Sequence, residues 1–329
     1  MLHVLNGEST AESLKQSGLP GERLVWKEAL IWGPTPPGLS LSEWCRFRAD
    51  FLADANAKDA QQCFEDLMQQ EAVLGKLSSH DEVVFWFEFD LFCQLNLIYA
   101  LNRLHGQNLS ATKLSLICIG EFPGINDFRG LGQLTAEQLV SLFPGRQPLT
   151  PAQISLAGRA WNACCSSNPQ QIEVLLALDT TPLPFLRSAL QLHLRRFPSV
   201  KNGLGHMERM ALEYIACGVN RFPELFRKWS AAEPGYGLGD AQLWDVLIRL
   251  VECERPILRL DGRKALGFSE NYPHLNQLAF TLTETGHSIL EGKHDLWEMQ
   301  PQEVWLGGVR LVPPNPRWRW DEERQVLAG

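Results

Sequence analysis

Hydrophobic positions in the first part of the chain alternate between short continuous runs and helical stripes. The runs cover residues 2–5, 23–32, 81–89 and 113–120, and the segments between them carry apolar residues at helical spacing. Strands that alternate with helices in this way form a mostly parallel sheet with helices on both faces. We therefore expect a three-layer, Rossmann-like α/β domain over residues 1–134.

The pattern becomes helical after residue 134. Helices are predicted to start at Thr135, Thr150, Pro169 and near Pro184. We expect residues 135–198 to form a helical connection that packs on the first domain. Beyond a glycine-containing hinge, three helical segments and several short strands predict a winged-helix-like α+β domain over residues 199–329.

Charge and hydropathy narrow the range of partners. The 329 residues carry a formal net charge of −8, and no run of basic residues offers the surface that nucleic acid needs. Nucleic acid is therefore not an expected partner. We expect no membrane span, because no apolar stretch reaches about 18 residues, and the N-terminus does not resemble a signal peptide. A cytoplasmic protein that binds a small molecule or another protein is the resulting expectation.

Neither the cysteine spacing nor the glycine motifs indicate a cofactor. The eight cysteines are scattered, with no CxxC pair and no spacing typical of a metal site. Most stand beside apolar residues, so we expect reduced core thiols and no metal ion. Both G-x-G-x-x-G after a strand and G-x-x-x-x-G-K-[ST] are missing, and the cofactor stays unknown.

The loop over residues 6–10 (NGEST) is the first candidate site. It follows the carboxyl end of a strand and precedes a helix, where open parallel sheets bind ligands. Two interpretations of Ser9 stay open. Ser9 and Glu12 fit a capping box, which needs no function. Alternatively, Ser9 is a catalytic nucleophile.

The nucleophile hypothesis rests on a similarity to the SGNH esterases. The segment GEST resembles their Gly-Asp-Ser block, and GIND at residues 124–127 matches their G-x-N-D block. That family supplies its acid and base as D-x-x-H, and a nucleophile needs both. None of the eight histidines follows an aspartate at this spacing, although His287 and His294 follow glutamates. The esterase is therefore the weakest of three functional hypotheses.

The second candidate site follows the most apolar run. Alternation along a strand puts Glu88 and Asp90 on one side at its carboxyl end, with Gln94 one helical turn further. If the first and third strands lie near each other, these residues converge with Glu8 and Ser9. Paired carboxylates act as acid and base, bind a divalent ion, or hold a ribose or amine. The structural alternative is that Asp90 caps the next helix and Glu88 is solvated.

Two further segments are ambiguous. The glycine-rich segment 120–133 follows the fourth strand and either covers a ligand or is a plain connection. Lys27 and Glu28 lie within the second strand, where a structural pair or a strand-edge feature is the simpler interpretation.

Several longer motifs carry a family resemblance. The segments VLNGEST, LVWKEALIW, HDEVVFWFEFDLFCQLNL and FRGLGQL resemble a bacterial family named domain of unknown function 1835. The segments NGLGHMERMALEYI, LTETGHSILEG and WLGGVRL are similar to the module that accompanies it, domain of unknown function 3658. The resemblance implies a two-module cytoplasmic bacterial protein without an assigned reaction. This chain departs from the family pattern at Glu8, Lys27 and Phe89, where Asp, Arg and His are usual.

Our leading hypothesis is a polar, nucleotide-like small molecule bound at the carboxyl edge of the first sheet, with an enzymatic role left open. Glu88, Asp90 and Ser9 are its candidate catalytic residues. The candidate ligand-binding residues are Asn6, Gly7, Glu8, Thr10, Trp26, Glu28, Trp86 and Gln94. The competing hypothesis is a regulatory or scaffold protein that acts through the winged-helix-like domain.

Overall fold

The structure is a computed structural model that describes residues 1–56, 59–261, 268, 272–299 and 302–329. Its largest sheet has five strands in the order β2-β1-β4-β5-β6. The first four are parallel and β6 is antiparallel to β5. These strands are β1 (Leu2–Leu5), β2 (Glu22–Val25), β4 (Glu82–Glu88), β5 (Lys113–Ile119) and β6 (Gln147–Pro148). The prediction of a mixed α/β fold around a mostly parallel sheet is confirmed, whereas the Rossmann-like layout stays a prediction.

Strand β4 lies between β1 and β5, and all seven of its residues are buried. Its side chains alternate between two hydrophobic clusters. Phe85 and Phe87 belong to one cluster, while Val84 and Trp86 belong to the other. A strand covered on both faces has no polar face, which explains the continuous apolar run.

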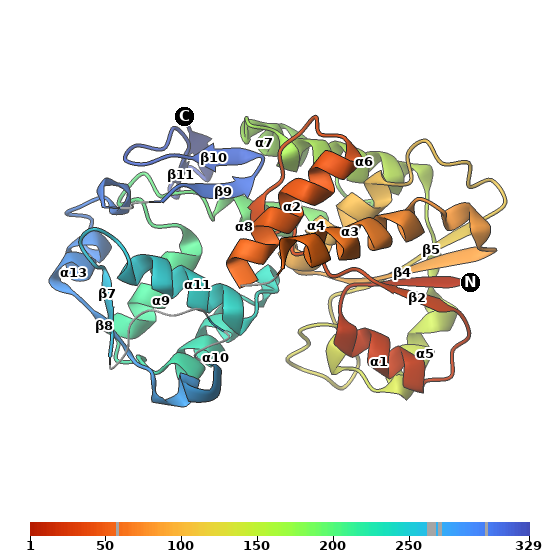
Figure 1. Ribbon diagram of the computed structural model, residues 1–329, viewed down its shortest axis with the longest axis horizontal. Coiled ribbons are helices and arrows are strands. Elements are labelled where there is room, and N and C mark those ends of the chain that lie inside the picture. Colours follow the sequence, from red (N-terminus) through yellow and green to blue (C-terminus); the bar gives the residue numbers. More distant parts are fainter. Residues whose placement is uncertain (57–58, 262–267, 269–271, 300–301) are drawn as a thin grey trace.

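Helices cover both faces of this sheet (Figure 1). One face packs on α1 (Glu8–Gln16) and α5 (Ala136–Leu142), which contribute Leu14 and Leu139 to the smaller cluster. The larger cluster, on the other face, includes Leu67 and Ile98. Its helices are α2 (Leu41–Asn56), α3 (Ala60–Leu74), α4 (Leu91–Asn102), α6 (Pro151–Cys165), α7 (Gln170–Leu176) and α8 (Leu186–Leu194). Of the predicted helix starts, Thr135 and Thr150 are confirmed as N-caps with capping boxes.

The last third of the chain contains the predicted helices and short strands. The helices are α9 (His206–Ala216), α10 (Phe222–Ala232), α11 (Asp240–Val251) and α13 (Glu284–Leu290). Strands β7 (Leu258–Leu260) and β8 (Phe280–Leu282) form an antiparallel pair. Two further antiparallel pairs are β9 (Val304–Gly307) with β10 (Val309–Leu311) and β11 (Arg319–Asp321) with β12 (Val326–Ala328). The winged-helix-like layout itself stays a prediction.

A three-stranded sheet, formed by β10, β9 and β3 (Gly33–Pro34) in that order, contains strands from both the N-terminal and the C-terminal part of the chain. Strand β3 pairs in parallel with β9. The strand predicted over residues 23–32 is shorter in the structure, because β2 ends at Val25. The chain turns after it, and Leu30 and Ile31 are buried in the larger cluster. That cluster also includes residues of the C-terminal part, so the boundaries at 134 and 198 stay predictions.

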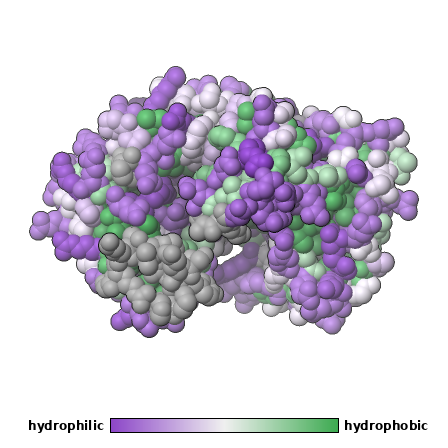
Figure 2. All heavy atoms as spheres, viewed as in Figure 1, coloured by the Kyte–Doolittle hydropathy of each residue, from purple (hydrophilic) through white to green (hydrophobic). Residues whose placement is uncertain are grey.

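Polar residues cover much of the face of the molecule shown in Figure 2, and a hollow lies beside the part that holds α1 and α5. Within the described residues, no helix combines the length and hydrophobicity needed to cross a membrane. No disulfide is formed among the described residues, and five of the eight cysteines are buried (Cys45, Cys93, Cys164, Cys165 and Cys253).

Candidate functional site

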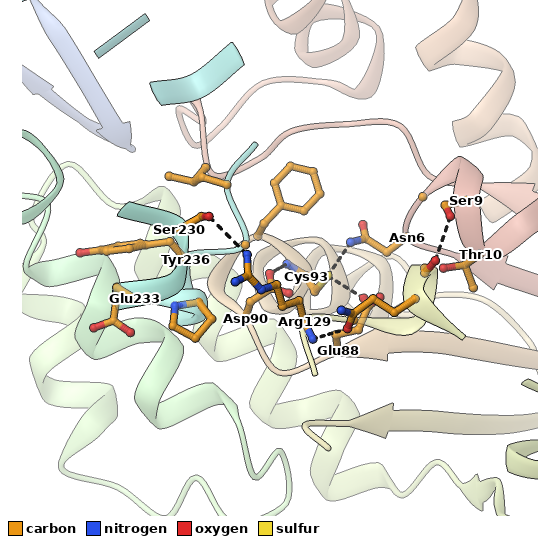
Figure 3. Close-up of a pocket in the computed structure, with 18 of the residues that line it drawn as sticks. Asn6, Ser9, Thr10, Glu88, Asp90, Cys93, Arg129, Ser230, Glu233 and Tyr236 are labelled. Carbon is orange, nitrogen blue, oxygen red and sulfur yellow. Dashed lines mark hydrogen bonds between the residues drawn. The ribbon is translucent and has the colours of Figure 1, made fainter. Parts of the chain in front are cut away.

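A cavity of about 480 Å³ lies beyond the carboxyl ends of β1 and β4. We call it the sheet-edge cavity. The two candidate sites meet there, because residues of the segments 6–10 and 88–93 both line it, together with residues 129–133 of the glycine-rich segment. Residues 226–238 close the opposite side (Figure 3). Its walls therefore come from both the sheet and the C-terminal helices.

Glu88 is the last residue of β4 and is 5% exposed. Its Oε1 accepts a hydrogen bond from the backbone N–H of Leu131 at 2.8 Å, and its Oε2 accepts one from the Cys93 thiol at 2.7 Å. Gly130 packs directly against the carboxylate, because a Cβ there would lie 2.9 Å from Oε1. The glycine-rich loop therefore fixes the orientation of this acid.

Asp90 is the N-cap of α4 and is 3% exposed. Its Oδ1 accepts a hydrogen bond from the Cys93 N–H at 2.9 Å, so the predicted capping role is confirmed. The accompanying idea that Glu88 is solvated is wrong, because that side chain is buried. Gly237, with φ of +67°, covers Asp90 so closely that any Cβ there would collide with the carboxylate. The C-terminal part of the chain thus seals the acid.

Neither carboxylate forms a salt bridge with another described residue. Within the described residues, no Lys, Arg or His nitrogen lies within 4.0 Å of either Glu88 or Asp90. Burial raises the pKa of both carboxyl groups, and the Asp90 charge raises the pKa of Glu88 further. A buried pair of this kind holds a proton readily and is stabilised by any positive group that reaches it.

Cys93 connects the pair to the first loop. Its sulfur accepts a hydrogen bond from the Asn6 side chain at 2.7 Å, and Asn6 in turn accepts one from Asn96 at 2.7 Å. Ligand atoms of Glu88, Asp90 and Cys93 lie within 4.8 Å of one another, which is compact enough to surround a divalent ion. Cysteine at this position was not among the predicted site residues.

Gln94 lies outside the cavity and contacts the end of β4. Its side chain is buried and donates a hydrogen bond to the backbone carbonyl of Glu88 at 2.7 Å. It does not line the cavity. Its position is therefore that of a residue that orients the strand end rather than one that contacts a ligand.

Ser9 and Thr10 line the cavity from the first turn of α1, and Gly7 lines it as the N-cap of this helix. The expected Ser9 capping box is wrong, because the N-cap is Gly7, two residues earlier, with φ of 137°, and the helix starts at Glu8. The Ser9 hydroxyl instead donates a hydrogen bond to the Gly132 carbonyl at 3.1 Å. In the described chain, no histidine lines this cavity, so Ser9 has no histidine base there.

The structure places the other predicted ligand-binding residues away from the cavity. Glu8 is exposed and pairs with Lys27 at 2.6 Å. Glu28 is buried and pairs with Arg48 at 2.5 Å, so Lys27 and Glu28 pair with different partners rather than with each other. Two tryptophans fill the core on opposite faces of the sheet, Trp26 in the larger cluster and Trp86 in the smaller one.

Sequence reasoning missed the lining contributed by residues far along the chain. Arg129 reaches across the cavity and donates a hydrogen bond to the Ser230 hydroxyl at 3.3 Å (Figure 3). Glu233 and Tyr236 lie on the same side as Ser230. A contact between residues 101 positions apart leaves no local signal, and treating residues 199–329 as a separate domain hid it.

Comparison with known protein families finds no match. A segment of 83 residues is 32% identical to part of Beta-mannosidase A from Aspergillus terreus, and it covers 25% of this chain. It spans only 8% of that protein. A match of this extent shows neither a family nor a function, and the resemblance to the two domain families stays a prediction.

Proposed function

We propose that the protein binds a polar, nucleotide-like small molecule in the sheet-edge cavity and uses Glu88 and Asp90 to exchange a proton with it. One observation carries this proposal. Two acids are almost completely buried in the wall of a cavity, and no Lys, Arg or His nitrogen of the described residues lies within 4.0 Å of either one. Burying charge without a partner is costly, so such an arrangement is typical of a functional site.

The size and lining of the cavity support a small ligand. A volume of about 480 Å³ is within the usual range for small-molecule sites. Carboxylates suit the hydroxyl and amino groups of a nucleoside or a sugar, while Phe92 and Phe226 offer apolar surface. Cysteines without disulfides in the described chain fit a reducing compartment, and a cytoplasmic location is part of the proposal.

A thermal-shift screen tests binding. Nucleosides, nucleotides, sugars and amines are added to the wild type and to Glu88→Gln and Asp90→Asn, with a chelator present throughout. We expect at least one compound to raise the melting temperature of the wild type and to lose this effect in both variants. Glu121→Gln is the control, because Glu121 is an exposed acid outside the cavity. An equal response in all four proteins would refute the proposal.

Proton exchange needs a second readout. A compound identified by the screen is incubated with the protein in heavy water, and NMR follows deuterium at its carbon-bound positions. We expect incorporation with the wild type and none with Asp90→Asn. Binding without incorporation would leave the protein a binding protein and remove the acid–base role.

A further inference from the structure

A second cavity, of about 440 Å³, lies between α2, α9, α11 and the strands β9 and β10. We call it the arginine cavity. It shares no lining residue with the sheet-edge cavity within the described chain. Much of its wall is apolar, formed by Trp32, Phe51, Trp297, Leu306 and Leu311.

Arg196 brings a buried positive charge to this cavity. The side chain is 5% exposed, and no carboxylate oxygen of the described chain lies within 4.0 Å of it. One Nη contacts Nδ1 of His193 at 3.3 Å, and the Nε–H has no partner. His193 does not supply a counter-charge, since burial lowers its pKa to about 3 and it is neutral at physiological pH.

Two more side chains in the same lining have unused hydrogen-bonding atoms. Arg249 and Glu208 approach each other only to 3.6 Å between Nη2 and Oε1. The Nε–H of Arg249 and the Oε2 of Glu208 are buried without partners. Asp245 adds a second acid, and burial raises the pKa of its carboxyl group. Unpaired buried donors and an unpaired acceptor thus occur together, which native proteins normally avoid.

We propose that the arginine cavity binds a free amino acid with an apolar side chain. The argument is charge balance. The inner lining has two cations, Arg196 and Arg249, and two acids, Glu208 and Asp245. A simple anion would lie beside the two acids, and a simple cation beside the two guanidinium groups. A zwitterion satisfies both sets and adds no net charge to the buried site.

The assignment of groups follows from the unused atoms. The ligand carboxylate binds the guanidinium groups of Arg196 and Arg249, for which planar carboxylates are the best partner. The ligand ammonium group donates to the Glu208 carboxylate, which lines the cavity. The apolar side chain packs against the tryptophans at positions 32 and 297. Three further acids of the lining, Asp54, Glu252 and Glu303, are exposed at its rim, where solvent screens them.

Calorimetric titration with L-phenylalanine and L-leucine tests this proposal. 3-Phenylpropionate lacks the ammonium group, and 2-phenylethylamine lacks the carboxylate. We expect at least one of the two amino acids to bind, and both analogues to bind at least tenfold more weakly. Absence of amino-acid binding, or equal affinity for either analogue, overturns the proposal.

Variants locate the binding. Arg196→Met is expected to abolish it, and circular dichroism shows whether this variant folds. Arg249→Met, at a less buried position, is the second variant and is expected to weaken binding at least tenfold. Glu121→Gln, which changes an exposed acid outside this cavity, is the control and is expected to bind as the wild type does. Unchanged affinity in folded Arg249→Met refutes the site. The response of the sheet-edge cavity to its own ligand is independent of this result.

Discussion

Replacing Asp90 with asparagine is expected to stabilise the protein above neutral pH. Asparagine keeps the N-cap oxygen that accepts from the Cys93 N–H, so α4 loses no capping bond. It removes a buried charge that lies next to Glu88 and has no cationic partner within the described chain. Relief of such burial is worth about 1–3 kcal/mol.

The pH dependence of this effect has a defined sign. The pKa of Asp90 is higher in the folded protein than in the unfolded chain, so its contribution to stability is complete at low pH and is lost as pH rises through the folded pKa. The advantage of Asp90→Asn over the wild type therefore grows with pH. It approaches zero below the unfolded pKa of about 3.9, where both side chains are neutral.

Urea unfolding of both proteins between about pH 4 and pH 8, with a chelator present, measures this difference. Asp90→Asn should be more stable than the wild type at about pH 8 and similar to it at about pH 4. A variant that is less stable than the wild type at about pH 8 would show that a group in the protein compensates Asp90, and the argument for a functional pair would fail.

Three other substitutions test parts of the fold. Gly237→Ala should lower the unfolding free energy, measured in urea, by about 2–4 kcal/mol, because the new Cβ collides with the Asp90 carboxylate and is also strained at a left-handed φ. The control Gly218→Ala, with φ of +88° and open space around it, should lower it by only about 1 kcal/mol. Glu28→Gln leaves Arg48 buried without its counter-charge and should lower the unfolding free energy by about 3–5 kcal/mol; a loss below about 1 kcal/mol would contradict the buried pair. His193 has a pKa of about 3 in the folded protein, so the stability it contributes is complete above the unfolded pKa of about 6.5 and is lost as pH falls. His193→Gln should therefore reduce the slope of unfolding free energy against pH below 6.5 by about 1 kcal/mol per pH unit. An unchanged slope would contradict the burial of a neutral His193.

The local parts of the site were predictable from sequence because they depend on strand parity. A continuous apolar run identified the central strand, and alternation put Glu88 and Asp90 together at its carboxyl end. Parallel strands end at one edge, which brought the loop at 6–10 to the same place. To predict these features, the only long-range contact that must be known is the pairing of β1 with β4.

Other features depend on contacts that periodicity does not encode. Gly7 rather than Ser9 is the N-cap of the first helix, because its positive φ lets the chain turn straight out of β1. Trp26 and Glu28 lie beyond the end of β2, where the chain turns into the core and away from the sheet edge. The C-terminal half of the cavity, including Gly237, depends on packing between distant segments, for which the sequence has no local pattern.

The central claim is that the buried acids at the sheet edge hold a ligand. Isothermal titration of the compound with the largest thermal shift against wild type, Asp90→Asn and Glu121→Gln measures it most directly. The account predicts that Asp90→Asn weakens binding at least tenfold, about 1.4 kcal/mol, while Glu121→Gln leaves the affinity unchanged. Equal affinity of all three proteins would contradict it.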